Sequence, residues 1–277
     1  MSHGYILPPS PAVIVGYPRL SARPAGPRAT GWGASVSGVC GRYATTRSAG
    51  DLSTIFESFD ETGGRLSAAY NVAPTDPVPL VQATTAGQRV LSLGRWGFVP
   101  AWSRSLAGAA RMINARAETV ATSRAYARAF ARHRCLLPAD GWYEWVRHPG
   151  GKQACYLTPQ DGSPVVFAGI WSVWKGPGGP LLTCGIVTTP ARGDLADVHD
   201  RMPLLVPRER WGAWLGPTDR PTDLLAPPSL EWLAGLEIRP VGPAVGNVRN
   251  DGPSLVERVT ASVPPRRGSG LGEETLF

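Results

Sequence analysis

Four residues of this chain are of types that could carry covalent and proton-transfer chemistry: Cys40, Asn114, Glu144 and His199. A cysteine thiolate is a strong nucleophile, and histidine and glutamate side chains move protons when their pKa lies near the working pH. Cys40 stands in the stretch SVSGVCGRYATT, behind a segment rich in Gly, Ala, Pro and Ser. Two interpretations of Cys40 are open: it is an ordinary buried thiol, or it is the first residue of the working protein.

An N-terminal cysteine would bring two reactive groups together. Its α-amine has an ordinary pKa near 8 and its thiol near 8.5, whereas a lysine amine has a pKa near 10.4. An aldehyde that meets this pair forms an imine, and the sulfur then closes on the imine carbon to give a thiazolidine. The two lysines, Lys152 and Lys175, lie in glycine-rich stretches and are expected to be solvated charges.

Asn114 and Arg116 stand two residues apart in MINARAETV. On an extended segment this spacing points both side chains to one side. An amide and a guanidinium placed in this way could hold a sugar and a phosphate together.

Glu144 and His199 are the candidates for proton transfer. Glu144 lies between aromatic residues in DGWYEWV, on an expected strand, where partial burial would raise its pKa. His199 lies in DVHDRMP, with polar neighbours inside an apolar context. A surface glutamate on an edge strand and a structural histidine remain the alternatives. The other histidines, His3, His133 and His148, are expected at disordered or surface positions.

The composition fits one large core with irregular ends. The chain has 277 residues, of which 43% are hydrophobic, and no apolar run or signal pattern indicates a membrane or export segment. We therefore expect a soluble cytoplasmic protein. Residues 1–38 hold three arginines and no acid, so the formal charge of +7 leaves +4 for the rest, a basic body that fits a polyanion. Four separated cysteines predict neither disulfides nor a zinc site, and we expect them to be reduced.

Several elements are expected to position the four residues. Helical spacing predicts a helix over 51–59, with Asp51 as N-cap, and a second helix over 118–133. The proline-rich residues 70–81 predict an extended loop or edge strand, and residues 89–102 alternate like a strand. From residue 134 onward, short apolar runs separated by Gly/Pro turns predict strands, with a helix over 208–216 and a last strand over 236–242. The fold class is therefore α+β, with a mostly antiparallel, strongly bent, barrel-like sheet and flanking helices.

Eight segments together resemble one known family. They occur in the order CGRYATT, YNVAPT, RWGFVPAW, INARAET, LLPADGWYEW, IVTTPA, VHDRMPLLV and VGNVRNDGPSLVE, across residues 40–257. In this order they resemble the SOS-response-associated peptidase (SRAP) family of abasic-site processing proteins. Val39 stands where that family has its initiator methionine.

The resemblance implies a function and a set of residues. An N-terminal cysteine, here Cys40, would trap the aldehyde of an abasic site in single-stranded DNA as a thiazolidine, which shields the strand from cleavage; protease or lyase-type reversal steps would release it. By the same resemblance Asn114 would orient the sugar, Glu144 would move protons and His199 would assist ring opening. No metal or organic cofactor is implied. The resemblance places further residues in a DNA-binding groove: Arg42, Asn71, Trp102, Arg116, Arg124, Thr188 and Arg201.

The same interpretation divides the chain. Residues 1–38 are expected to be a disordered leader that is absent from the natural product, because an amide at the Cys40 nitrogen would forbid the imine. A GTG codon, which is read as valine inside a gene, can also serve as a start codon read as methionine, so Val39 could mark the true start. Residues 39–262 would form a single SRAP-type domain, and residues 263–277 a flexible tail. The tail ends in EETLF, which weakly resembles peptides that bind sliding clamps. We expect a monomer that associates with the nucleoid when on DNA.

Two other functions remain open on the sequence. A thiol peptidase or amidase would use Cys40 as nucleophile, His199 as base and Glu144 or Asn114 as the orienting group. A non-covalent single-strand binder would use only the arginine and tryptophan residues of the groove.

Overall fold

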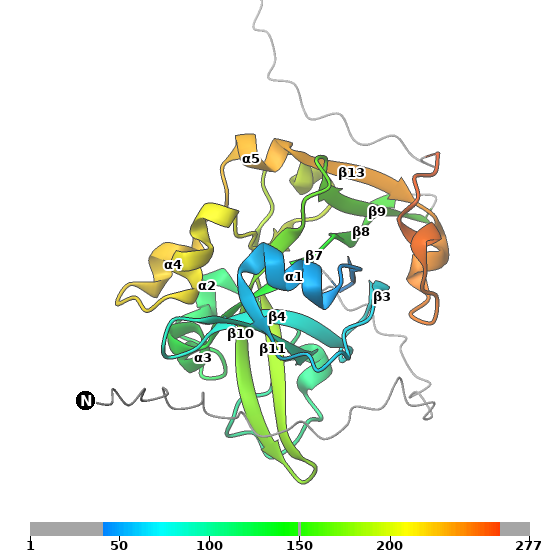
Figure 1. Cartoon of the computed structure of the whole chain (residues 1–277). Coiled ribbons are helices and arrows are strands. Elements are labelled where there is room, and N and C mark those ends of the chain that lie inside the picture. Colours follow the sequence, from blue (N-terminus) through cyan, green and yellow to red (C-terminus); the bar gives the residue numbers. More distant parts are fainter. Residues whose placement is uncertain (1–40, 149–150, 261–277) are drawn as a thin grey trace, which may run out of the picture.

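The computed structural model describes residues 41–148 and 151–260 of the chain. Within them, two β-sheets pack together and short helices lie around them (Figure 1). The leader, Val39, Cys40 and the tail lie outside the described residues. The strands are β1 (Tyr43–Thr45), β2 (Ser58–Asp60), β3 (Ala69–Val72), β4 (Pro77–Ala83), β5 (Arg89–Trp96), β6 (Asn114–Arg116), β7 (Arg134–Ala139), β8 (Gly141–His148), β9 (Gly151–Pro159), β10 (Val165–Gly176), β11 (Gly179–Pro190), β12 (Arg201–Pro203) and β13 (Leu236–Val241). The α-helices are α1 (Ala49–Phe56), α2 (Ala117–Val120), α3 (Ala127–Arg132), α4 (Trp211–Leu215) and α5 (Leu230–Ala234). The 3-10 turns are η1 (Ala109–Arg111), η2 (Gly193–Asp197), η3 (Arg208–Arg210), η4 (Pro221–Leu225), η5 (Pro243–Gly246) and η6 (Pro253–Val256).

Five strands close into a small barrel. Around it, β11, β10, β7, β4 and β5 are neighbours, and β5 returns to pair with β11. This closing pair is parallel and the other four are antiparallel. A Cβ at Gly94 or Gly169 would collide with Leu80 or Leu137. The narrow interior therefore requires glycine at these two positions.

The second sheet is antiparallel throughout and carries the start of the described chain. Its order is β13, β9, β8, β1 and β3. Tyr43 of β1 makes edge contacts with Trp96 and Phe167 of the barrel, at centroid distances of 5.1 Å and 5.6 Å. These three rings are fully buried, so β1 packs directly on the barrel. The expected α+β class with a mostly antiparallel, bent sheet is confirmed.

Figure 1 shows where the remaining elements lie. The hairpin of β10 and β11 extends beyond the rest of the molecule at the bottom of the view, and α3 and α4 lie on the left. The orange segment that follows β13 lies on the right, beside β3 and β9. The last described residues thus return to the sheet that contains β1. None of the described helices is both long and apolar enough to cross a membrane.

The first helix begins and ends earlier than expected. Its N-cap is Ser48, whose hydroxyl accepts the backbone N–H of Asp51, while the Asp51 carboxylate accepts the N–H of Ser48. Asp51 is thus the N3 member of a capping box and not the cap itself. The helix ends at Phe56 because Glu57 takes a left-handed conformation with φ 50°. The chain then enters β2, where a longer helix was expected.

The expected helix over 118–133 is two short helices, α2 and α3. Between them the N–H groups of Thr122 and Ser123 both bond to the carbonyl of Thr119. The hydroxyl of Thr122 also donates to that carbonyl, at 3.3 Å. Hydroxyl side chains that compete for backbone groups favour turns over a continuous helix. Ala129 and Phe130 are buried as expected.

The proline-rich segment forms β3 and β4, and β4 is not an edge strand. It lies between β5 and β7, which corrects the edge expectation. Pairing with β7 involves only Val81 and Gln82. Pro77 and Pro79 precede this paired stretch, so their missing N–H groups do not interrupt that ladder.

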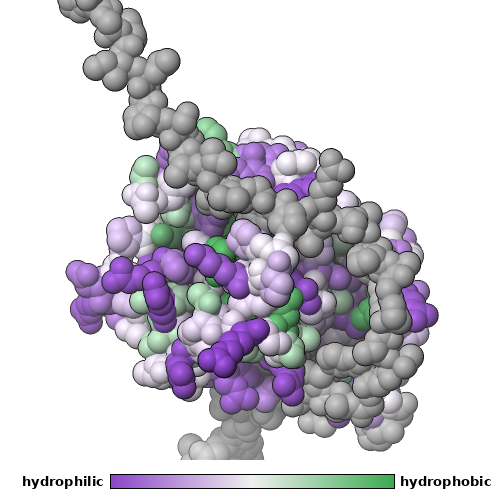
Figure 2. Space-filling view, turned by 90° about the horizontal axis from the view of Figure 1, so that it is seen from below, coloured by the Kyte–Doolittle hydropathy of each residue, from purple (hydrophilic) through white to green (hydrophobic). Residues whose placement is uncertain are grey.

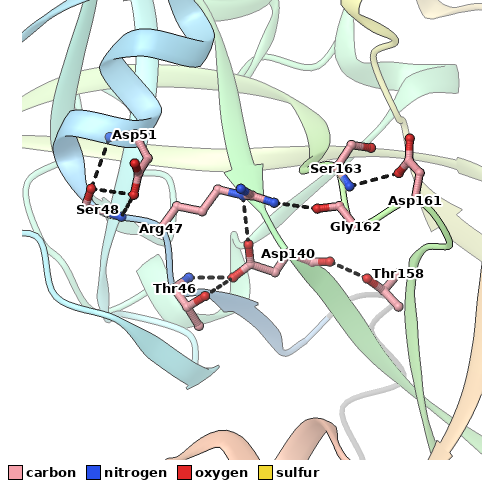
Figure 3. Close-up of polar contacts among 9 residues, drawn as sticks. All are labelled: Thr46, Arg47, Ser48, Asp51, Asp140, Thr158, Asp161, Gly162 and Ser163. Carbon is pink, nitrogen blue, oxygen red and sulfur yellow. Dashed lines mark hydrogen bonds and ion pairs between the residues drawn. The ribbon is translucent and has the colours of Figure 1, made fainter.

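The run RCLLPADGWYEWV forms two strands, β7 and β8, that belong to different sheets. Asp140 lies between them and joins them to β1 (Figure 3). Its carboxylate accepts the N–H and hydroxyl of Thr46, at 2.6 Å and 2.7 Å, and forms an ion pair with Nε of Arg47 at 3.3 Å. Its carbonyl accepts the Thr158 hydroxyl at 2.7 Å, and Arg47 also donates to the carbonyl of Gly162. One aspartate thus ties β1 to the turn between the two sheets and to β9.

Two further expectations are corrected by burial. His133, expected at the surface, is partly buried and stacks on Trp171 at a centroid distance of 4.5 Å. Burial lowers the pKa of this histidine. His148 is also partly buried. The three described cysteines, Cys135, Cys155 and Cys184, are free and buried in the core.

Candidate functional site

The site begins where β1 leads back towards Cys40. Tyr43 of β1 lies opposite Trp142 of β8, and the N–H of Tyr143 bonds to the carbonyl of Arg42 at 3.0 Å. Continuing this antiparallel register by one residue places Gly41 opposite Glu144. Gly41 is the residue that follows Cys40 in the chain. Cys40 itself lies outside the described residues.

Glu144 is a buried carboxyl group in the middle of β8. Only 4% of its surface is exposed, and it is paired across the sheet with Cys155 of β9. It shares a sheet face with Trp142, two residues away, which packs in the main core. The alternative of a surface glutamate on an edge strand is wrong, because β8 lies between β9 and β1. A carboxyl group in this setting is a candidate for proton transfer.

Asn114 and Arg116 lie on β6, which runs parallel to β11. The extended segment was expected, and the register pairs Asn114 with Ile186 and Arg116 with Thr188. Ala115, between them, is buried, whereas Arg116 is exposed. Tyr126 donates its hydroxyl to the carbonyl of Asn114 at 3.3 Å. The segment is therefore fixed, with its guanidinium at the surface.

Arg201 is bound to this segment through a carboxylate that the sequence analysis did not single out. Its guanidinium meets both carboxylate oxygens of Glu118, at 2.7 Å and 3.0 Å, and donates to the carbonyl and hydroxyl of Thr188. These bonds hold the pKa of Glu118 below its ordinary value. The available signal was an acidic residue in the first turn of a helix, which is where Glu118 lies in α2. Thr188 and Arg201, both expected in a groove, are thus in direct contact.

His199 lies two residues before Arg201 and is partly exposed. Its Nδ1 lies 3.0 Å from the backbone N–H of Arg201 and 2.6 Å from a carboxylate oxygen of Asp200. A neutral Nδ1 lone pair accepts the first contact, and a protonated Nδ1 donates in the second, so the two contacts belong to different protonation states. Both contacts fix the orientation of the imidazole ring beside Arg201.

Arg42 and Asn71 hold a loop rather than facing solvent. The Asn71 amide donates to the carbonyls of Val245, Asn247 and Asn250, at 3.3 Å, 3.0 Å and 2.9 Å. Arg42 donates to the Asn71 side chain at 2.9 Å and to the carbonyl of Val245 at 3.0 Å. These bonds fasten the loop after β13 onto β1 and β3, directly beside the segment that leads to Cys40.

Trp102 and Arg124 form a surface pair. The Arg124 guanidinium carbon lies 5.2 Å from the Trp102 ring centroid, and Trp102 is 61% exposed. A ring held in this way in solvent can stack on a base. In the described part of the face shown in Figure 2, hydrophilic areas surround small apolar ones, so exposed apolar residues are scattered there.

The structure brings the expected residues into two groups on two sheets that pack together through aromatic contacts. The first contains Arg42, Asn71 and Glu144 on the antiparallel sheet, and the second contains Asn114, Arg116, Thr188, His199 and Arg201 around β11. Tyr43 of the first sheet contacts Trp96, whose indole N–H donates to the carbonyl of Ile113, next to Asn114. Tyr126, two residues after Arg124 in the chain, donates its hydroxyl to the carbonyl of Asn114 and so connects the Arg124 segment to the second group.

The sequence profile of the SOS response associated peptidase (SRAP) family matches residues 39–248. The chain belongs to the SRAP family. Proteins of similar sequence to this SRAP protein include abasic site processing protein YoqW of Bacillus subtilis (strain 168), which is 32% identical over 233 residues, 79% of this chain and 99% of the relative. Abasic site processing protein YedK of Escherichia coli (strain K12) is 30% identical over 80% of this chain and 100% of the relative. Abasic site processing protein HMCES of Gallus gallus is 28% identical, over 82% of this chain and 80% of the relative.

Solved structures share the fold of this SRAP protein. A crystal structure from Bacteroides thetaiotaomicron superposes with a TM-score of 0.70 at 21% identity, covering 80% of this chain and 100% of the other. A crystal structure of a phage-related protein from Bordetella bronchiseptica has a TM-score of 0.56 at 28% identity, and the match covers 73% of this chain and 94% of the other. The expected SRAP-type architecture is thereby confirmed.

Proposed function

We propose that this SRAP protein captures the aldehyde of abasic sites in single-stranded DNA through the α-amine and thiol of Cys40. Three of its relatives carry the name abasic site processing protein. The observation that carries the proposal is the buried carboxyl of Glu144, which the strand register sets opposite Gly41, the residue that follows Cys40. A buried acid beside the chain end suits the proton transfers of imine chemistry.

The proposed reaction balances without a cofactor. The free α-amine of Cys40 adds to the ring-opened aldehyde, and loss of water gives an imine. The thiol then adds across the C=N bond, with sulfur on carbon and the proton on nitrogen. Glu144 would deliver the proton to the departing hydroxyl and accept one in return. The products are a thiazolidine and one water molecule.

Other residues would bind the damaged strand. Asn114 would orient the deoxyribose, Arg116 would hold the adjoining phosphate, and His199 would assist ring opening or reversal. Trp102 would stack on a base, and Arg124 and Arg201 would neutralise phosphates. For Arg42, Asn71 and Thr188, the contacts described above favour a role in shaping the groove.

The crosslink would protect the strand. An abasic aldehyde undergoes β-elimination, which cuts the DNA, and a single strand offers no template for repair. A thiazolidine removes the aldehyde and so blocks this elimination. Release by reversal or by proteolysis belongs to the same proposal.

The reaction requires a free amine at Cys40. We infer that residues 1–38 are absent from the working protein and that Val39 is the initiator. The family match that begins at residue 39 supports this. The domain would then span 39–262, act as a monomer on nucleoid DNA in the cytoplasm, and carry in residues 263–277 a tail that would contact a sliding clamp.

The test is intact mass spectrometry of the protein expressed from its native start region, before and after incubation with single-stranded DNA that carries one abasic site. We expect a chain that begins at Cys40 and gains the mass of the oligonucleotide minus one water. DNA with a tetrahydrofuran analogue, which has no aldehyde, should give no adduct. Cys40→Ala and Cys40→Ser should both bind DNA but give no adduct.

Other outcomes would overturn the proposal. A wild-type chain that begins at Cys40 and gains no mass would refute it. An activity on peptides that survives with the α-amine blocked would favour the thiol peptidase instead. Binding of DNA with equal affinity by wild type and Cys40→Ala, without any adduct, would favour the non-covalent binder.

A further inference from the structure

Arg95 is a partly buried arginine that makes no hydrogen bond or ion pair through its side chain within the described part of the chain. Its Nε atom is buried, and the guanidinium makes no hydrogen bond or ion pair with any other residue in 41–148 or 151–260. The other partly buried arginines of the site are bound: Arg42 donates to Asn71, and Arg201 to Glu118. Even Arg134, which is almost fully buried, donates to four backbone carbonyls.

Arg95 lies at the end of β5 that is next to the site. Alternation along the strand places it on the outer face of the barrel, the same face as Leu91, because Trp96 points into the core. The strand continues towards Phe98, whose N–H bonds to the carbonyl of Met112, two residues before Asn114. Arg95 pairs with Thr183 of β11, and Asn114 pairs with Ile186, three residues further along that strand. Arg95 and Asn114 therefore lie along the same edge of β11.

Asp76 lies beside Arg95, because the N–H of Trp96 bonds to the carbonyl of Asp76 at 3.0 Å. Burial lowers the pKa of the Arg95 and Arg42 guanidinium groups, and the negative charge of Asp76 opposes this shift in both. One oxygen of Asp76 already accepts the N–H of Ala73 at 3.0 Å. The turn that holds Asp76 contains Thr75 at φ 80°, a strained conformation for a β-branched residue. One carboxylate thus acts on two cations, and a positive charge remains.

We propose that Arg95 forms a further binding site for a phosphate group of single-stranded DNA. Two observations carry it: the Arg95 guanidinium makes no hydrogen bond to the described residues, whereas Arg42 and Arg201 do, and the nearby carboxylate of Asp76 also acts on Arg42. A half-buried cation without hydrogen-bond partners is costly, and a phosphate oxygen would offset that cost with charge-assisted bonds. The identity of the polyanion as DNA rests on the proposed function.

The same strand provides a matched control. Arg89 lies at the other end of β5, on the same face, and is also partly buried. It differs because it donates to the carbonyl of Phe56 at 3.0 Å. Arg89→Gln therefore removes the same charge and breaks a structural bond, whereas Arg95→Gln removes a charge that has no bond to lose.

The experiment measures the dissociation constant of a short oligothymidylate without an abasic site, for wild type, Arg95→Gln and Arg89→Gln, over a range of salt concentrations. For Arg95→Gln we expect affinity to fall about fivefold and the slope of log K against log salt to decrease by about 0.7, the value for one phosphate contact on a single strand. Thermal unfolding of this variant should occur at the same temperature as wild type or higher. Arg89→Gln should keep the affinity and the slope but unfold at a lower temperature.

Each contrary result has a definite meaning. An unchanged slope for Arg95→Gln would overturn the phosphate site, and so would a lowered unfolding temperature with unchanged affinity, which would make Arg95 structural. The oligothymidylate carries no aldehyde, so this measurement is independent of the crosslink. If wild type binds it in an Arg95-dependent way but gives no adduct with abasic DNA, the phosphate site stands and the proposed chemistry fails.

Discussion

Where β1 leads into α1, the Asp140 carboxylate and its polar neighbours are bonded to one another, whereas at the other end of β1 a buried carboxyl group, Glu144, lies opposite the residue that follows Cys40. At the first end the Asp140 carboxylate bonds to Thr46 and pairs with Arg47, and Ser48 and Asp51 complete a capping box (Figure 3). At the second end Arg42 and Asn71 bond to the loop after β13, Glu144 is buried, and Nε of Arg95 has no hydrogen-bond partner among the described residues. This difference teaches that the first end serves to stabilise the fold, whereas the second combines structural bonds with candidate groups for chemistry.

The largest effect is expected from Glu144→Gln, at the second end. Without an ionisable carboxyl, the rate of adduct formation with abasic DNA should fall about 100-fold, the lower range for loss of a general acid and base. The affinity for undamaged single-stranded DNA should stay the same. Rapid-quench gels of adduct formation measure the rate.

Glu209→Gln is the matched control, because Glu209 is exposed in η3. It should react at the wild-type rate. If Glu144→Gln also reacted at that rate and only unfolded more easily, Glu144 would belong with the stabilising end and the contrast between the two ends would fail.

The next effect is expected from Asp140→Ala, at the first end. The substitution removes the acceptor for two groups of Thr46, so we expect a loss of about 2 kcal/mol in the free energy of unfolding. Urea unfolding measures this loss. Asp161→Ala, which removes only the exposed bond to the N–H of Ser163, should cost less than about 0.5 kcal/mol. A slower reaction per folded molecule in Asp140→Ala would show that the first end also serves the chemistry.

The smallest effect concerns Glu118, which binds Arg201 in the group around β11. Because its pKa is held below the ordinary value, the ionised group stabilises the folded protein above about pH 4.3, and this stabilisation is lost as the pH falls through the lower folded pKa. The Glu118 side chain is 46% exposed, so we expect less than about 1 kcal/mol.

The measurement compares the free energy of unfolding of wild type and Glu118→Gln from pH 7 down to about pH 2.5. The variant should be less stable at pH 7, and the two should converge in acid. A difference that stayed constant with pH would mean that the carboxylate charge does not hold Arg201.

Much of the site was predictable because it depends on local pattern. The extended segment of Asn114 and Arg116 and the strand that carries Glu144 follow from residue spacing. The bounds predicted for the first helix were too late in the chain, because Ser48 and Asp51 cap this helix reciprocally and single-residue preferences do not include such a contact. The length predicted for the helix over 118–133 was too great, because the alanine content was given more weight than the hydroxyl residues at its centre.

The amino-acid sequence by itself determined the family, the α+β class and the residue types that can react, since these reside in composition, spacing and ordered motifs. Only the tertiary structure decided that Glu144 is buried beside Gly41, that Glu118 binds Arg201, that Arg42 and Asn71 hold the loop after β13, and that Arg95 has no hydrogen-bond partner among the described residues. The physical reason is that burial and pairing depend on strands far apart in the chain. The register of β1 on β8 and of β6 on β11 decides which side chains are buried and which are paired, and no local pattern specifies that register.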